Sequence, residues 1–90
     1  MSYVYAAEKV RLFTDEGSRD FIANRDIAMR MVGETGAFRV LEFLGKSRGS
    51  DTWFRIACLD RMVEMGDLVK LPRDCWQQYE VYTSPRTHNH

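Results

Sequence analysis

Few side chains in this sequence have the chemistry of catalysis or metal binding. The two cysteines, Cys58 and Cys75, do not form a CxxC pair, and no histidine lies near Cys58 in the sequence. The histidines His88 and His90 lie in the polar terminal stretch, where a functional metal site would lack the ligands it needs. We identify neither a glycine-rich phosphate loop nor a nucleophile elbow. The sequence therefore predicts no enzyme, with no catalytic residue, no cofactor and no metal site.

The basic residues are the second feature of the sequence that could have a function. Ten of the thirteen basic residues are arginine, the type suited to bidentate contact with phosphates, guanine edges or carboxylates. The thirteen acidic residues bring the net charge to zero, whereas a domain that neutralises phosphates is usually clearly basic. Any attraction to nucleic acid must therefore come from the local placement of charge.

Length and composition indicate a single domain over residues 1–90. The hydrophobic fraction of 44% and the charged fraction of 29% are those of a folded protein. No apolar run approaches the roughly 20 residues that cross a membrane, and the N-terminus does not read as a signal peptide. With only two cysteines, both expected to be reduced, we predict a cytoplasmic protein without a membrane partner.

The first half of the chain predicts helices. The segment from Tyr3 to Phe13 fits a helix or two short strands, and the helix is favoured because its apolar residues recur at helical spacing. Ser18 is the expected cap of a second helix from residue 19, which Gly33 ends. A third helix is expected from Thr35. Its core-facing stripe has the spacing i, i+3, i+4 and i+7, and is made up of Ala37, Val40, Leu41 and Leu44.

The second half predicts one well-marked helix and a hairpin. After a polar turn over residues 46–50, Ser50 or Asp51 caps a helix that covers residues 51–65 and that Gly66 ends. Its buried stripe is expected to be Ile56, Leu59 and Val63, flanked by Met62. Residues 67–71 then predict a short strand, and residues 76–82 a second one. Tyr79 and Val81 alternate with Gln78, Glu80 and Tyr82 in the second strand, which suits an antiparallel hairpin with one solvated face. Residues 84–90 are expected to fray.

This order resembles a winged helix-turn-helix domain, a mainly α fold with a C-terminal β-hairpin wing. The likeness is carried by residues 38–44 and 52–68, above all by the run Leu59-Asp60-Arg61-Met62-Val63-Glu64-Met65-Gly66-Asp67-Leu68, which is similar to the end of a recognition helix. The resemblance makes residues 68–82 the wing and leaves residues 1–17 as an N-terminal extension. Because only a short turn precedes residues 51–65, either the domain is a trimmed variant or residues 19–32 form its first helix.

The resemblance also implies which residues bind DNA. A recognition helix presents the exposed side chains of its N-terminal part to the major groove, while the preceding turn and the wing contact the backbone. Arg55 is the candidate for a guanine edge. The candidate DNA-binding residues are Lys46, Arg48, Ser50, Thr52, Trp53, Arg55, Arg61, Lys70 and Arg73.

A plainer interpretation competes with this one, namely that these charges only keep the surface soluble. Four aspartates near the proposed surface would repel phosphate: Asp51, Asp60, Asp67 and Asp74. Trp53 is expected to be a partly buried residue at the start of a helix. The aromatic residues Trp76, Tyr79 and Tyr82 are expected to pack the wing onto the helices.

Two functions therefore stay open. The first is a small transcriptional regulator that reads double-stranded DNA, in a homodimer paired through residues 3–13. The alternative is a winged-helix protein-interaction module, such as a small phage or plasmid factor that docks on a host protein complex. A purely structural subunit is a third option. A steep salt dependence of DNA binding separates the first from the others.

Overall fold

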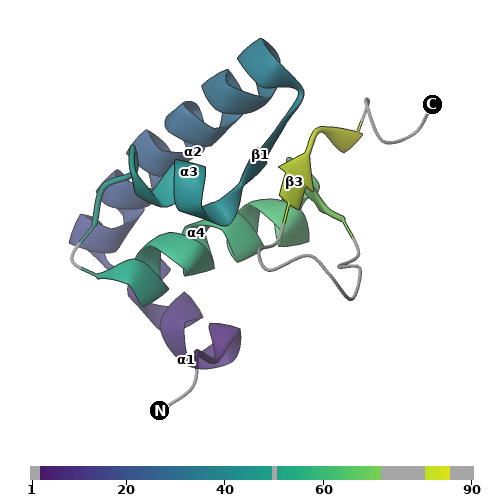
Figure 1. The fold of residues 1–90 in the computed structure, drawn as a ribbon. Coiled ribbons are helices and arrows are strands. Elements are labelled where there is room, and N and C mark those ends of the chain that lie inside the picture. Colours follow the sequence, from purple (N-terminus) through teal and green to yellow (C-terminus); the bar gives the residue numbers. More distant parts are fainter. Residues whose placement is uncertain (1–2, 50, 72–80, 86–90) are drawn as a thin grey trace.

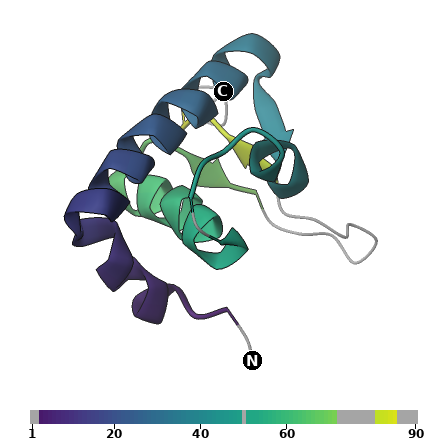
Figure 2. The ribbon, with the colours of Figure 1, turned by 90° about the vertical axis from the view of Figure 1, so that its left-hand side faces the viewer.

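The computed structural model describes residues 3–49, 51–71 and 81–85. The described chain is mainly helical, with a three-stranded antiparallel sheet. Its elements are α1 (Tyr5–Lys9), the 3-10 helix η1 (Val10–Phe13), α2 (Asp15–Thr35), β1 (Ala37–Arg39), α3 (Val40–Leu44), α4 (Thr52–Met65), β2 (Val69–Lys70) and β3 (Val81–Thr83). Figures 1 and 2 show α2 and α4 side by side, with α1 and the sheet on different sides of α4. No helix in these described ranges is long and apolar enough to cross a membrane.

Helix α2 is longer at both ends than the sequence predicts. Thr14 caps it, since its Oγ1 accepts a hydrogen bond from Gly17 N at 3.0 Å. Ser18, the expected cap, instead donates its hydroxyl to the Leu12 carbonyl at 3.0 Å. At the other end the helix continues through Gly33, because one exposed glycine lowers the stability of a helix by only about 1 kcal/mol relative to alanine. It ends at Gly36, whose φ of 82° suits a residue without a side chain.

The predicted third helix from Thr35 is wrong in its first half, which forms strand β1. Strand β1 pairs with β3 in the register Ala37–Thr83, Phe38–Tyr82 and Arg39–Val81, and β2 pairs with the other edge of β3, so the strand order is β1-β3-β2. Helical spacing of apolar residues is a local signal, and here the pairing with a strand more than forty residues away overrides it. The helix is confined to α3.

The main core lies between α2, α4 and the sheet. Its buried residues are Ala28, Met31, Val32, Phe38, Phe43, Leu59, Met62, Leu68 and Tyr82. Leu41, a predicted core residue, is 50% exposed, because β1 changes which side of the chain faces inward and Phe43 is buried instead. Tyr82 is fully buried in this core, as expected from its packing onto the helices, whereas Val81 on the opposite face is half-buried. The inward face of the strand at these two residues is therefore that of Tyr82 and not that of Val81.

Helix α4 agrees with the predicted range of residues 51–65. Asp51 caps it, with Oδ1 accepting a hydrogen bond from Phe54 N at 2.8 Å, and Gly66 ends it with a φ of 89°. Within the predicted buried stripe Leu59 and Met62 are fully buried, whereas Ile56 and Val63 are half-buried. The predicted antiparallel hairpin is also present as β2 and β3, although its residues 72–80 lie outside the described part of the chain.

We expect Phe43→Ala to lower the free energy of unfolding by about 3–5 kcal/mol, because it empties a fully buried site. The matched control is Leu41→Ala on the same helix, which removes a half-exposed side chain and should cost less than about 1 kcal/mol. Chemical denaturation followed by circular dichroism measures both. Equal costs for the two variants would contradict the inward orientation of Phe43.

Candidate functional site

The turn between α3 and α4 gathers most of the predicted binding residues. Lys46, Arg48 and Thr52 are exposed there, while Arg55 and Trp53 are half-buried, as predicted for Trp53. Lys46 and Arg48 form no ion pair with any residue in the described ranges. We call the segment from Lys46 to Arg48 the basic turn.

Arg55 holds this turn against the start of α4. Its Nη1 donates to the Leu44 carbonyl at 3.1 Å, and its Nε donates to the Asp51 carbonyl at 3.3 Å. The guanidinium therefore satisfies a main-chain carbonyl at the end of α3 and adds positive charge beside the basic turn. An arginine has five N–H donors, so the remaining donors can still bind another group.

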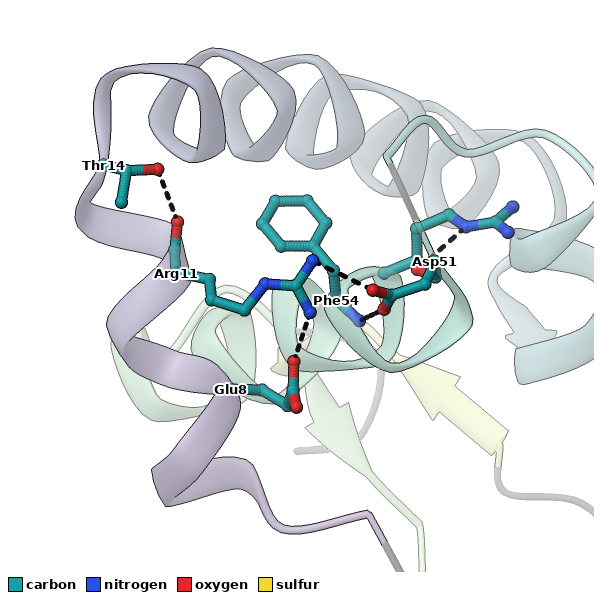
Figure 3. Close-up of polar contacts among 6 residues, drawn as sticks. Glu8, Arg11, Thr14, Asp51 and Phe54 are labelled. Atoms are coloured by element: carbon teal, nitrogen blue, oxygen red, sulfur yellow. Dashed lines mark hydrogen bonds and ion pairs between the residues drawn. The ribbon is translucent and has the colours of Figure 1, made fainter.

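An arginine from η1 pairs with Asp51, the capping residue of α4 that follows the basic turn. Figure 3 shows the Arg11 guanidinium between two carboxylates, 2.6 Å from Glu8 Oε1 and 2.9 Å from Asp51 Oδ2. The guanidinium carbon also lies 5.5 Å from the centre of the Phe54 ring. The hydrogen bonds from Arg11 and from Phe54 N lower the pKa of Asp51 below its usual range, so this carboxylate is ionised and paired.

The other described aspartates near the predicted surface are paired as well. Asp67 Oδ2 accepts from Arg25 Nε at 2.8 Å, and Lys70 Nζ lies 3.8 Å from Asp60 Oδ1. Asp74 lies outside the described residues. The repulsion of phosphate that a charge count implies is therefore partly cancelled by cations beside the three described aspartates.

Not every predicted binding residue belongs to this group. Arg61 lies further along α4, where its Nη1 is 2.8 Å from Glu64 Oε1 and its guanidinium 5.3 Å from the Phe13 ring centre. Lys70 lies on β2 beside Asp60. Ser50 and Arg73 lie outside the described residues.

The N-terminal segment packs on α4 of its own chain. Tyr3 OH donates to Asp60 Oδ2 at 2.6 Å, and Lys9 Nζ donates to Glu64 Oε2 at 2.9 Å. Beneath these contacts lies a second core of Leu12, Phe54, Ala57 and Cys58. One side of α4 is thus covered by α1 and η1, which restricts its accessible surface. The predicted pairing of residues 3–13 between two chains stays a prediction.

Sequence reasoning missed Asn24, the residue behind the basic turn. Asn24 is fully buried on α2 and its amide faces the Arg48 backbone: Nδ2 donates to the carbonyl at 2.6 Å, and Oδ1 accepts from the N–H at 2.6 Å. Nδ2 also lies 3.5 Å from Cys58 Sγ. The available signal was an amide among apolar residues, because Asn24 lies three and four residues from Phe21 and Ala28 on the inward face of the helix.

Two described side chains with nucleophilic potential, Cys58 and Ser47, are in unreactive settings. Burial raises the pKa of the Cys58 thiol to about 11, so it is protonated at neutral pH. Residues 45–49 spell GxSxG, but Ser47 follows a helix rather than the strand of a nucleophile elbow. Its buried Oγ has no partner among the described residues. No group of His, Cys, Asp and Glu that could hold a metal ion occurs in the described ranges.

A surface cavity of about 210 Å³ lies where the start of α2 meets η1 and α4. Its lining residues are Arg11, Thr14, Glu16, Gly17, Asp20 and Phe54. Small-molecule sites usually enclose about 300–1,000 Å³, so this cavity is too small for a typical organic ligand.

Comparison with known proteins gives no family for this chain: no protein family, curated protein or solved structure matches it.

Glu64 provides a test of the docking of the N-terminal segment. Hydrogen bonds from Lys9, Arg61 and Tyr5 lower its pKa from 4.5 to about 2. Because the folded-state pKa is depressed, the stabilisation is fully present above the unfolded pKa and is lost as the pH falls through 4.5 towards 2. We expect this loss of stability to be shallower in Glu64→Gln.

Carboxyl carbon NMR of Glu64 through the titration, with denaturation at several pH values, measures the effect. A Glu64 pKa near 4.5 in the folded protein would show that α1 does not hold this carboxylate.

Proposed function

We propose that this chain is a winged helix-turn-helix domain. Helix α2, strand β1 and helices α3 and α4 are followed by the antiparallel strands β2 and β3, and all three strands form one sheet in the order β1-β3-β2. This arrangement supports the interpretation as a helical unit with a wing. In this arrangement α2 is the first helix, in line with the second of the two options that the sequence left open. Helix α4 takes the place of the recognition helix, and residues 1–17 include the segment packed on it.

We further propose that the domain binds double-stranded DNA and acts as a transcriptional regulator. The observation that carries the proposal is the pairing of charges around the α3–α4 turn. Lys46 and Arg48 are exposed without an ion pair to any described residue, while the nearby Asp51 is paired with Arg11. A protein with no net charge can attract phosphates where its cations are free and its carboxylates are neutralised locally.

The contacts with DNA follow from this geometry. Lys46 and Arg48 neutralise phosphates, and the exposed Thr52 hydroxyl donates to a phosphate oxygen. The donors of Arg55 that are not bound to main-chain carbonyls read a base edge next to the turn. The middle of α4 contributes little, since its residues between Trp53 and Val63 are half-buried or buried. In a dimer, two such turns would bind two half-sites.

A specific observation also favours the alternative of a protein-interaction module. The N-terminal segment and α2 expose large apolar side chains: Val4 is 54% exposed, Val10 68%, Phe13 61% and Ile22 60%. Large exposed apolar patches mark sites of protein contact, and in this alternative these side chains contribute to such a patch. In this alternative the segment packed on α4 presents its outer side to a partner protein.

Titration of a mixed-sequence DNA duplex, followed by fluorescence anisotropy, tests the DNA proposal. We expect a Kd of about 1–100 μM near 50 mM salt that weakens steeply at about 200 mM. Lys46→Ala and Arg48→Ala should each weaken binding by about tenfold at the lower salt and reduce the salt slope by about 1, because each removes one phosphate contact.

Arg30→Ala is the matched control, since it removes a cation of α2 that is also exposed and has no ion pair to a described residue. Its affinity should equal that of the wild type. Equal loss in all three variants would indicate a general charge effect, and absence of binding at both salt concentrations would favour the protein-interaction module.

A further inference from the structure

A buried side chain from α2 holds the basic turn at Arg48. Asn24 of α2 is 24 residues away from Arg48 in the sequence and completely buried. Its amide forms two reciprocal hydrogen bonds with the Arg48 main chain, both 2.6 Å long. The Asn24 side-chain amide therefore bonds to the N–H and the carbonyl of Arg48 in the way that the main chain of a neighbouring β-strand would.

The turn needs such a partner because no regular element provides one at Arg48. The main-chain N–H groups of Lys46 and Ser47 still donate to the Phe43 carbonyl, at 3.0 and 2.9 Å, and so complete the end of α3. At Arg48 this local bonding stops, and Asn24 satisfies both the N–H and the carbonyl. A main-chain group left without a partner near the core is costly, so these bonds fix the path of the chain.

Only a few side chains can do this. The site requires one donor and one acceptor on the same short planar group, which an amide provides and a carboxylate or an alkyl group does not. The second N–H of the amide points at Cys58 Sγ, 3.5 Å away on α4. Asn24 thus connects α2 and α4 to the basic turn in one contact.

We infer that Asn24 is the positioning residue of the DNA-binding surface, an inference that rests on the proposed function. It touches no DNA itself. It sets the position of the Arg48 backbone, and with it the direction in which Arg48 extends from the surface. Loss of the amide would release the turn at Arg48, so this cation would no longer be held where it meets a phosphate.

The test combines Asn24→Leu with a double-mutant cycle. Asn24→Leu keeps a side chain of similar size but removes both hydrogen bonds. We expect its duplex affinity near 50 mM salt to fall by about tenfold, as for loss of one phosphate contact. In a chain that already carries Lys46→Ala and Arg48→Ala, Asn24→Leu should have no further effect, because no turn cation is left to position.

Two further variants separate positioning from loss of stability. Val32→Ala changes another core residue of α2 away from the turn, and its folded fraction should bind duplex like the wild type. Asn24→Ser is the second variant if Asn24→Leu does not fold, and its shorter hydroxyl should also lower the affinity. Circular dichroism gives the folded fraction, and hydrogen exchange of the Arg48 amide should become faster in either Asn24 variant.

The outcomes distinguish the inference from the function on which it rests. If the wild-type chain does not bind duplex DNA, both the proposed function and this inference are wrong. If the wild type binds but the Asn24 variants bind equally well, or lose the same affinity with and without the turn cations, only the role of Asn24 is wrong. Unchanged exchange of the Arg48 amide would also overturn it.

Discussion

The position of Phe38 is the constraint on which the rest of the structure depends. Its ring is stacked between those of Tyr82 and Phe43, with centroid distances of 5.7 and 6.0 Å. The contact with Tyr82 commits residues 37–39 to a strand, and the contact with Phe43 then determines which side of α3 faces the core. Since α3 leads directly into the basic turn, this aromatic layer also determines where the turn begins.

The well-predicted elements were those whose signals are local. Helix α4 could be read from the sequence because Asp51, an apolar periodicity and Gly66 mark its start, length and end within one segment. The strand β1 could not, because residues 35–44 satisfy a helical pattern and only the distant Tyr82 decides against it. The start of α2 was misplaced since Thr14 and Ser18 are both good caps, and the choice depends on the fold of η1.

The candidate site was predictable in its residue types but not in its electrostatics. A charge count treats Asp51 and Asp67 as free carboxylates, whereas Arg11 and Arg25 reach them from elements far away in the sequence. Such pairs depend on the tertiary fold and cannot be detected from the local composition of the sequence. The same holds for Asn24, whose pairing with Arg48 exists only once α2 lies against the turn.

The division of the interior into two cores has a consequence for motion. The segment of α1 and η1 is fastened through the smaller core around Leu12, whereas the sheet and most of α2 belong to the larger one. Parts of a protein with few buried contacts open locally at a lower free energy than the whole unfolds. Such an opening would carry Arg11 away and leave the Asp51 carboxylate without its counter-charge beside the basic turn. The attached N-terminal segment thus contributes, through Arg11, to the electrostatic potential of a surface that the segment itself does not form.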